Sequence, residues 1–287
     1  MSNPSASIAL EPSSPQKFSS FAEFARSCLL NIADFSGAAV WVVGCVLFLP
    51  SFSAEPSRYL WACICFIIGE WIYIGLGVYF FRAASGFIER CEAVGCFVGG
   101  ASFFWGTVLF LPARLQNNFG LLKSLASGMG AQLLNLPGND ESTYETPTLA
   151  FSGFVLFVIG SVGFSLSSLF NAMGLRDFTT WGGQMSAVNC ALHLGGGLFF
   201  CTGSMGFIQQ VNCGQQMVAI GAWSYIVGSL LYVAGASVAI ARDVHTFRSS
   251  EGNEQTAGLK NLVEHSDDSN ESMSDDEESD SRDGGAF

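Results

Sequence analysis

Long apolar runs alternate with short polar stretches along the chain. Six of these runs have the length of about 20 mostly apolar residues that an α-helix needs to cross the hydrocarbon core of a bilayer. They lie at residues 33–51, 59–81, 93–112, 148–171, 185–209 and 217–241. The pattern predicts an all-α integral membrane protein with six transmembrane helices and the lipid bilayer as its first partner.

Short sequence motifs recur and divide these helices into three pairs. GAAVWVVGCVLFLP at 37–50 aligns with GGASFFWGTVLFLP at 99–112, and GGLFFCTGSMGFIQ at 196–209 fits the same frame. The partner helices also repeat, as FIIGEW (66–71), FVIGSV (157–162) and YIVGSL (225–230). We therefore expect three tandem helical hairpins that share one orientation. A pseudo-threefold arrangement is compatible with this repeat but does not follow from it alone.

The repeat also sets the expected organisation of the chain. It comprises a cytosolic N-terminal segment (1–30), hairpin 1 (31–92), hairpin 2 with a long loop at 113–147 (93–175), hairpin 3 (176–246) and a C-terminal tail (247–287).

The hairpin pattern is similar to that of a known family. It begins with N-I-A-D-F-S-G at 31–37 and continues with G-C-V-L-F-L at 44–49, and the partner helix carries F-I-I-G or V-I-G-S. This pattern resembles the YrhK-like domain of small membrane proteins. The resemblance implies a two-helix membrane hairpin, here in three copies, and it transfers no catalytic or ligand-binding residue.

Charge separates the body of the chain from its tail. Residues 1–250 hold 12 acids and 10 bases, a balance of −2, whereas residues 251–287 hold 12 acids and 2 bases, a balance of −10. The tail has few large apolar residues to bury, so we expect it to be disordered. Ser272 and Ser274 each precede an acidic residue by three positions and are candidate phosphorylation sites. Phosphorylation of these serines and a solubilising tail whose serines are incidental fit the sequence equally well.

Basic residues near the helix ends predict the orientation in the membrane. Seven of them lie on the side that carries both termini, and three lie on the other side. Because cytosolic loops are enriched in Lys and Arg, both termini are predicted to be cytosolic. The seven are Lys17, Arg26, Arg82, Arg90, Arg176, Arg242 and Arg248, and the three are Arg58, Arg114 and Lys123.

Glycines recur seven residues apart in four of the predicted helices. Seven residues make about two helical turns, so each set forms a stripe that lets another helix approach closely. These stripes predict helix packing within the chain and leave homo-oligomer formation open. They comprise Gly37, Gly44, Gly99, Gly106, Gly196, Gly203, Gly221, Gly228 and Gly235.

One carboxylate interrupts the second predicted helix, in CFIIGEWIYIG. A charge at the centre of a bilayer costs about 2.5–3.5 kcal/mol on insertion scales, and such residues often mark functional sites. Glu70 occupies the repeat position that holds Ser161 and Ser229 in the other hairpins, and His193 lies in hairpin 3. These four residues form a candidate proton or cation site. The alternative is that Glu70 packs as a hydrogen-bonded residue and moves nothing.

The sequence offers no pattern for covalent chemistry. It contains no HExxH motif, no nucleophile–base set and no Cys/His set with metal-ligand spacing, and its basic residues are scattered. We therefore expect no catalytic residue, metal, cofactor or nucleic-acid partner. The favoured function is a non-enzymatic membrane protein with a regulatory or partner-binding tail. The alternative is a small proton or cation transporter or channel centred on Glu70.

Overall fold

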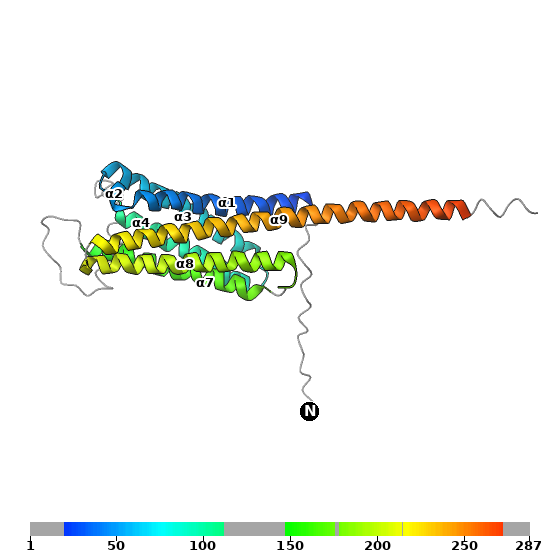
Figure 1. Cartoon of the computed structure of the whole chain (residues 1–287). Helices are drawn as coiled ribbons and strands as arrows, with labels where there is room; N and C mark the ends of the chain where they lie inside the picture. The colour runs from blue at the N-terminus through cyan, green and yellow to red at the C-terminus, as the bar shows by residue number, and fades with distance from the viewer. Residues whose placement is uncertain (1–19, 112–146, 176–177, 214, 272–287) are drawn as a thin grey trace, which may run out of the picture.

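The computed structural model describes residues 20–111, 147–175, 178–213 and 215–271, and every element in these residues is a helix (Figure 1). Helix α2 is a single short turn. The other six are long and apolar enough to cross a membrane, which confirms the number of spans that the sequence predicts. The helices are α1 (Phe21–Leu47), α2 (Pro50–Ser53), α3 (Pro56–Ala83), α4 (Phe87–Phe110), α7 (Pro147–Gly174), α8 (Trp181–Cys213) and α9 (Gln215–Glu271).

Capping residues and prolines set several helix ends. The hydroxyl of Ser20 accepts a hydrogen bond from the backbone N–H of Glu23, so α1 begins at Phe21, well before the predicted start at residue 33. Helix α1 ends at Leu47 and α2 starts at Pro50, which shortens the predicted span at its other end. Pro56 stands in the first turn of α3, where a helix does not need its missing N–H.

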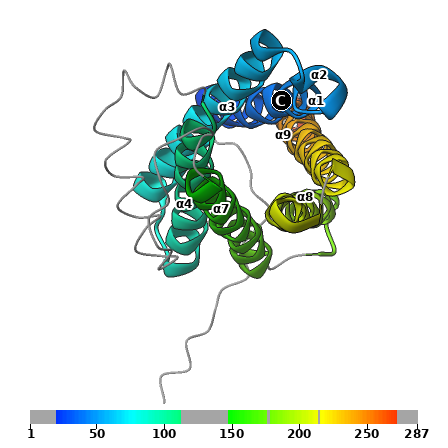
Figure 2. The same ribbon diagram turned by 90° about the vertical axis from the view of Figure 1, so that its left-hand side faces the viewer.

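The six long helices stand side by side and close into a ring (Figures 1 and 2). Each packs against the long helix that follows it in the chain, and α9 packs against α1. The first and last long helices are therefore neighbours. The N-terminal end of α1 and the part of α9 that leaves the ring lie at the same end of the bundle (Figure 1).

Six aromatic side chains fill the middle of the ring in two layers of three, which we call the aromatic plug. Ring centroids within the first layer are 5.4 to 6.2 Å apart. Those within the second layer are also 5.4 to 6.2 Å apart. The layers are joined by Trp41, which stacks on Tyr73 at 4.3 Å. The first layer is Trp41, Phe103 and Phe200, and the second is Tyr73, Phe164 and Tyr232.

Glycines accommodate these rings in the same way in three helix pairs, α1 with α3, α4 with α7 and α8 with α9. Trp41 covers Gly69, Phe103 covers Gly160 and Phe200 covers Gly228. A Cβ atom at any of these glycines would come closer than 3.0 Å to the ring, a distance that real Cβ atoms essentially never show. All nine predicted packing glycines likewise lie against the partner helix of their pair.

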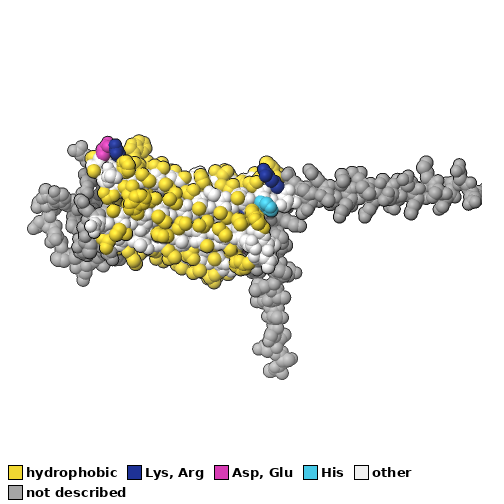
Figure 3. Space-filling view, viewed as in Figure 1, with side chains coloured by type: hydrophobic (Ala, Val, Ile, Leu, Met, Phe, Trp, Pro, Cys, Tyr) yellow, Lys and Arg dark blue, Asp and Glu magenta, His cyan; other side chains and the backbone are white. Residues whose placement is uncertain are grey.

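The outer surface of the ring is strongly apolar. Trp61, Trp71, Phe87, Leu198 and Trp223 are each 55 to 80% exposed. Apolar side chains cover the visible face of the helical body, and charged side chains appear only near its two ends (Figure 3). Soluble monomers rarely expose contiguous apolar patches larger than a few hundred Å². This surface suits a lipid environment.

The structure describes the first part of the segment that the sequence assigns to the tail. Helix α9 continues past residue 247 to Glu271. Residues 247–271 contain no proline and include several good helix formers, which allows the helix to continue. Ser272 and Ser274, and residues 113–146 of the predicted long loop, lie outside the described residues.

Candidate functional site: a polar cavity and a buried carboxyl group

Seven buried polar side-chain atoms in the described residues have no hydrogen-bond partner, and they fall into two groups. Leaving one buried polar atom without a hydrogen bond costs about 1–3 kcal/mol, so each of these atoms requires an explanation. The first comprises Trp41 Nε1, both carboxyl oxygens of Glu70 and Thr107 Oγ1. The second comprises Asn189 Oδ1, His193 Nε2 and the hydroxyl of Tyr232.

Glu70 lies on α3 beside the aromatic plug, and its side chain is completely buried. Its chain neighbour Gly69 is covered by the indole of Trp41. The indole N–H of Trp41 lies near the carboxyl group, but the two do not form a hydrogen bond of acceptable geometry. Burying an ionised carboxylate without a partner is very costly, so this environment favours the neutral acid.

The structure does not join Glu70 to the other three residues of the predicted site by a hydrogen bond. Ser161 Oγ lies 3.4 Å from Ser204 Oγ and donates to the carbonyl of Phe157. Ser229 Oγ lies 3.5 Å from Cys45 Sγ. Both serines are completely buried, and each lies where the second helix of one pair meets the first helix of the next pair.

The contacts of Ser161 and Ser229 with the next helix pair identify Thr107 as the residue expected opposite Glu70. Cys45, Thr107 and Ser204 each follow the second glycine of a stripe, at equivalent positions of α1, α4 and α8. Since Ser204 faces Ser161 and Cys45 faces Ser229, Thr107 occupies the equivalent place at the contact of α4 with α3. Sequence reasoning missed Thr107, although the repeat alignment contained the signal.

His193 belongs instead to a polar cavity of about 250 Å³ inside the ring. The cavity lies at the end of the bundle that holds the start of α1, since Ser27 and Asn31 line it. The second layer of the aromatic plug forms one boundary of the cavity. Its polar wall includes Asp34 of α1, Glu92 of α4, Asn171 of α7, Asn189 and His193 of α8 and Arg242 of α9. We call this space the polar cavity.

Asp34 is the carboxylate closest to His193 in the polar cavity. Its Oδ2 lies 3.5 Å from His193 Nε2, and the side chains of Asp34 and His193 remain 18% and 14% exposed. His193 Nε2 makes no hydrogen bond. Asp34, Cys96 and His193 occupy the same position of the three repeats, so one layer of the ring carries three different chemical groups.

Among the other charged side chains at the polar cavity, Arg242 has an oppositely charged partner and Glu92 has only a neutral one. Arg242 pairs with Asp243 at 2.7 Å, and Asp243 also accepts a hydrogen bond from Asn31. The carboxylate of Glu92 accepts one from the amide of Asn171 at 2.7 Å. Asp34 and Glu92 are therefore two carboxylates without an Arg or Lys partner in the part of the chain that the structure describes. Among those residues, no group of three or more His, Cys, Asp or Glu side chains is placed to hold a metal ion.

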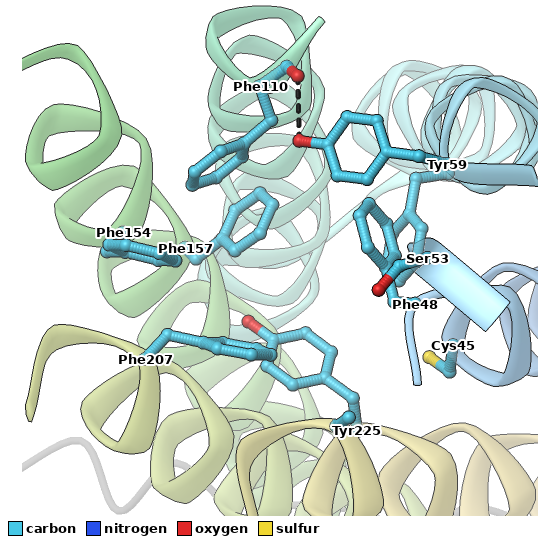
Figure 4. Close-up of a pocket in the computed structure, with 11 residues that line it drawn as sticks. Cys45, Phe48, Ser53, Tyr59, Phe110, Phe154, Phe157, Phe207 and Tyr225 are labelled. Atoms are coloured by element: carbon cyan, nitrogen blue, oxygen red, sulfur yellow. Dashed lines mark hydrogen bonds between the residues drawn. The ribbon is translucent and has the colours of Figure 1, made fainter. Parts of the chain in front are cut away.

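A second cavity of about 250 Å³ lies at the opposite end of the ring and is lined mostly by aromatic side chains (Figure 4). Phe48, Phe110 and Phe207, at equivalent repeat positions, point into it. The hydroxyl of Tyr59 donates to the carbonyl of Phe110 at 2.8 Å. We call this space the apolar cavity. The aromatic plug separates it from the polar cavity.

Sequence reasoning missed Asp34 and Glu92 for a physical reason. Asp34 is the second residue of the predicted span 33–51, where a carboxylate would lie in the interfacial region. Because α1 begins at Phe21, Asp34 instead lies more than three turns inside the helix. Glu92 similarly precedes the predicted span 93–112, but α4 begins at Phe87.

The fold and the apolar surface define an all-helical protein with six helices suited to a membrane. The family model of the YrhK-like proteins matches residues 185–244, which confirms the resemblance for the segment formed by α8 and the first half of α9. The matched segment supplies Asn189, His193, Tyr232 and Arg242 to the polar cavity. No curated protein and no solved structure matches the chain.

Proposed function

We propose that the protein is an integral membrane carrier for a small cation, and that the polar cavity is its binding site. The observation that carries the proposal is the placement of two carboxylates without an Arg or Lys partner, Asp34 and Glu92, inside a ring whose outer surface is apolar. A cavity that carries excess negative charge between low-dielectric walls attracts cations.

We further propose that the ring consists of three tandem YrhK-like hairpins. Three observations support this arrangement: the family match on α8 and α9, the repeated glycine–aromatic contacts in three helix pairs, and the meeting of equivalent residues in each layer of the plug. Layers of three equivalent residues are what a pseudo-threefold axis along the ring would produce.

Membrane insertion and orientation complete the proposal. The exposed apolar side chains support insertion of all six long helices. The excess of Lys and Arg on the side of both termini supports a cytosolic position for these termini. Since the polar cavity lies at that end, it would open toward the cytosol.

The aromatic plug favours a carrier over an open channel. Trp41, Phe103 and Phe200 are at most 2% exposed and lie between the two cavities. Movement of a cation across this barrier requires the plug to rearrange. Glu70, buried beside Trp41 without a hydrogen-bond partner, is our candidate for a proton-binding group that couples to this rearrangement.

The C-terminal segment supports a second, separate role in binding a soluble partner. Helix α9 extends beyond the ring (Figure 1) and carries acidic residues, up to Glu271, away from it. A cytosolic partner would therefore reach this segment without contacting the polar cavity.

The test of the carrier function is cation flux into sealed liposomes that contain the purified full-length protein. Imposed gradients of protons, Na⁺, K⁺ and alkylammonium ions would be compared for the wild type, Asp34→Asn and Glu70→Gln. Glu55→Gln is the matched control, because Glu55 is half exposed at the opposite end and pairs only with nearby Arg58 and Ser57.

We expect a wild-type flux that Asp34→Asn abolishes and Glu55→Gln preserves. The absence of any wild-type flux under all these gradients would overturn the proposal, as would a flux that Asp34→Asn leaves unchanged.

A further inference from the structure

The polar cavity has an aromatic boundary that a bare inorganic cation would not use. Tyr73, Phe164 and Tyr232 line it, and their rings stand edge to face at 5.4 to 6.2 Å. Trp41 stacks against Tyr73 from the other layer and holds it in place. The faces of aromatic rings attract organic cations, and clusters of such rings recognise alkylated ammonium groups.

Unsatisfied polar atoms stand beside these rings. Tyr232 lines the cavity and is only 3% exposed, and its buried hydroxyl has no hydrogen-bond partner. The ring of His193 packs on that of Tyr232 at 4.6 Å, and His193 Nε2 and Asn189 Oδ1 are also unpartnered. An ammonium group brings N–H donors, which the side-chain oxygens of Asn189 and Tyr232 can accept.

The charges that face this space favour a cationic ligand. Arg242 and Asp243 compensate each other at 2.7 Å. Asp34 faces His193, and Glu92 accepts a hydrogen bond from neutral Asn171. A ligand with one positive charge therefore finds Asp34 as a counter-ion within the same cavity.

The size of the cavity limits the ligand. Its volume of about 250 Å³ falls just below the range of about 300–1,000 Å³ that is typical of sites for small molecules. A molecule with a few heavy atoms fits, whereas a lone Na⁺ or K⁺ would leave most of the space and all of the aromatic boundary unused.

We infer that the polar cavity binds a small organic ammonium ion, with Asp34 as its counter-ion and the rings of Tyr73, Phe164 and Tyr232 around its alkyl part. This inference rests on the proposed cation-carrier function and names the class of its substrate. Tyr232 and Asn189 accept hydrogen bonds from the ammonium group.

The test is equilibrium binding to the full-length protein in detergent micelles, followed by calorimetry at constant ionic strength. The probes are propylammonium, tetramethylammonium, Na⁺, K⁺ and the uncharged analogue 1-propanol. Propylammonium and tetramethylammonium are expected to bind, and 1-propanol is expected to bind at least tenfold more weakly than propylammonium.

Two substitutions separate the contributions of charge and aromatic surface. Asp34→Asn and Phe164→Leu are each expected to weaken binding of both ammonium probes at least tenfold. Glu55→Gln and Phe97→Leu are the controls, since both side chains are exposed on the outside of the ring. If Asp34→Asn does not fold, as judged by gel filtration, Glu92→Gln replaces it.

A third substitution tests the hydrogen-bond assignment. Tyr232→Phe removes the unpartnered hydroxyl and keeps the ring. It is expected to weaken propylammonium binding severalfold and to leave tetramethylammonium binding unchanged, because the latter has no N–H donor.

The outcomes distinguish this inference from the proposed function. Flux of protons, Na⁺ or K⁺ without binding of either ammonium probe would overturn the inference and leave the carrier function standing. Ammonium binding that neither Asp34→Asn nor Phe164→Leu weakens would place the site elsewhere and also overturn it. Neither binding nor flux of any probe would overturn both.

Discussion

Cys45 Sγ in α1 lies 3.5 Å from Ser229 Oγ in α9. This contact joins the first long helix of the chain to the last and closes the ring. The equivalent contact between Ser161 of α7 and Ser204 of α8 joins the second and third helix pairs. At two of the three interfaces between helix pairs, the same repeat position holds a serine, Ser161 or Ser229. At the third interface this position holds the carboxyl group of Glu70.

Thr107 and Glu70 are predicted to be energetically coupled across the contact of α4 with α3. Both side chains are buried and lack a hydrogen-bond partner. In a double-mutant cycle of Thr107→Val and Glu70→Ala, we expect an interaction energy of at least about 0.5 kcal/mol, because neighbouring buried side chains couple by about 0.5–3 kcal/mol. The free energy of unfolding in micelles is the measurement.

The matched control for this cycle replaces Thr107→Val with Thr202→Val, because Thr202 is exposed on α8. Coupling to Thr202 as strong as the coupling to Thr107 would refute a specific contact. Glu70→Ala alone is expected to fold, since a small side chain, serine, occupies the position in the other two repeats.

Two glycines of α3 are predicted to respond oppositely to alanine. A Cβ at Gly69 would collide with the indole of Trp41, whereas a Cβ at Gly75 would meet nothing within 4 Å. We expect Gly69→Ala to lower the free energy of unfolding by about 1–3 kcal/mol through overpacking. Gly75→Ala should be neutral or stabilising by up to about 1 kcal/mol through helix propensity. Equal effects of the two substitutions would contradict the packing described for the plug.

Asp243 is predicted to stabilise the end of the ring that carries the polar cavity. It is 2% exposed and accepts hydrogen bonds from Ser27, Asn31 and Arg242. Asp243→Asn should lower the free energy of unfolding by about 1.5–3 kcal/mol, the usual contribution of hydrogen bonds to a charged group. Glu55→Gln, which disrupts an exposed pair, should change it by less than about 1 kcal/mol. Similar losses for the two variants would contradict this difference in burial.

Phe103 is predicted to hold the two cavities apart. It contacts Trp41 and Phe200 in the first layer of the plug and is 1% exposed. Phe103→Ala should therefore increase passive leakage of cations through liposomes that contain the protein. Phe97→Ala, on the exposed side of the same helix, is the control. Leakage that stays at the wild-type level in a correctly folded Phe103→Ala protein would show that the plug is not the barrier.

The helices and the glycine stripes were predictable from the sequence because both depend on local periodicity. The polar cavity was not, because its residues lie on all six long helices and meet only when α9 closes against α1. The predicted span places Asp34 at a helix end, because it was drawn from the apolar run that starts at residue 33, whereas the N-cap at Ser20 starts α1 at Phe21. Glu70 was recognised as a candidate site residue, but Thr107 was not. The sequence prediction grouped Glu70 with Ser161 and Ser229, whereas in the structure each serine contacts the adjacent helix pair.

The measurement that tests the account most directly is sided labelling of a cysteine at position 193 in an otherwise cysteine-free protein. His193 lines the polar cavity and is 14% exposed. In sealed vesicles, a membrane-impermeant maleimide should label His193→Cys from the side of the termini only, while Ser204→Cys, a nearly isosteric change at a completely buried position, should resist labelling from both sides. Propylammonium should slow the reaction at position 193. Equal labelling from both sides, or labelling only from the side opposite the termini, would contradict a one-sided polar cavity closed by the aromatic plug.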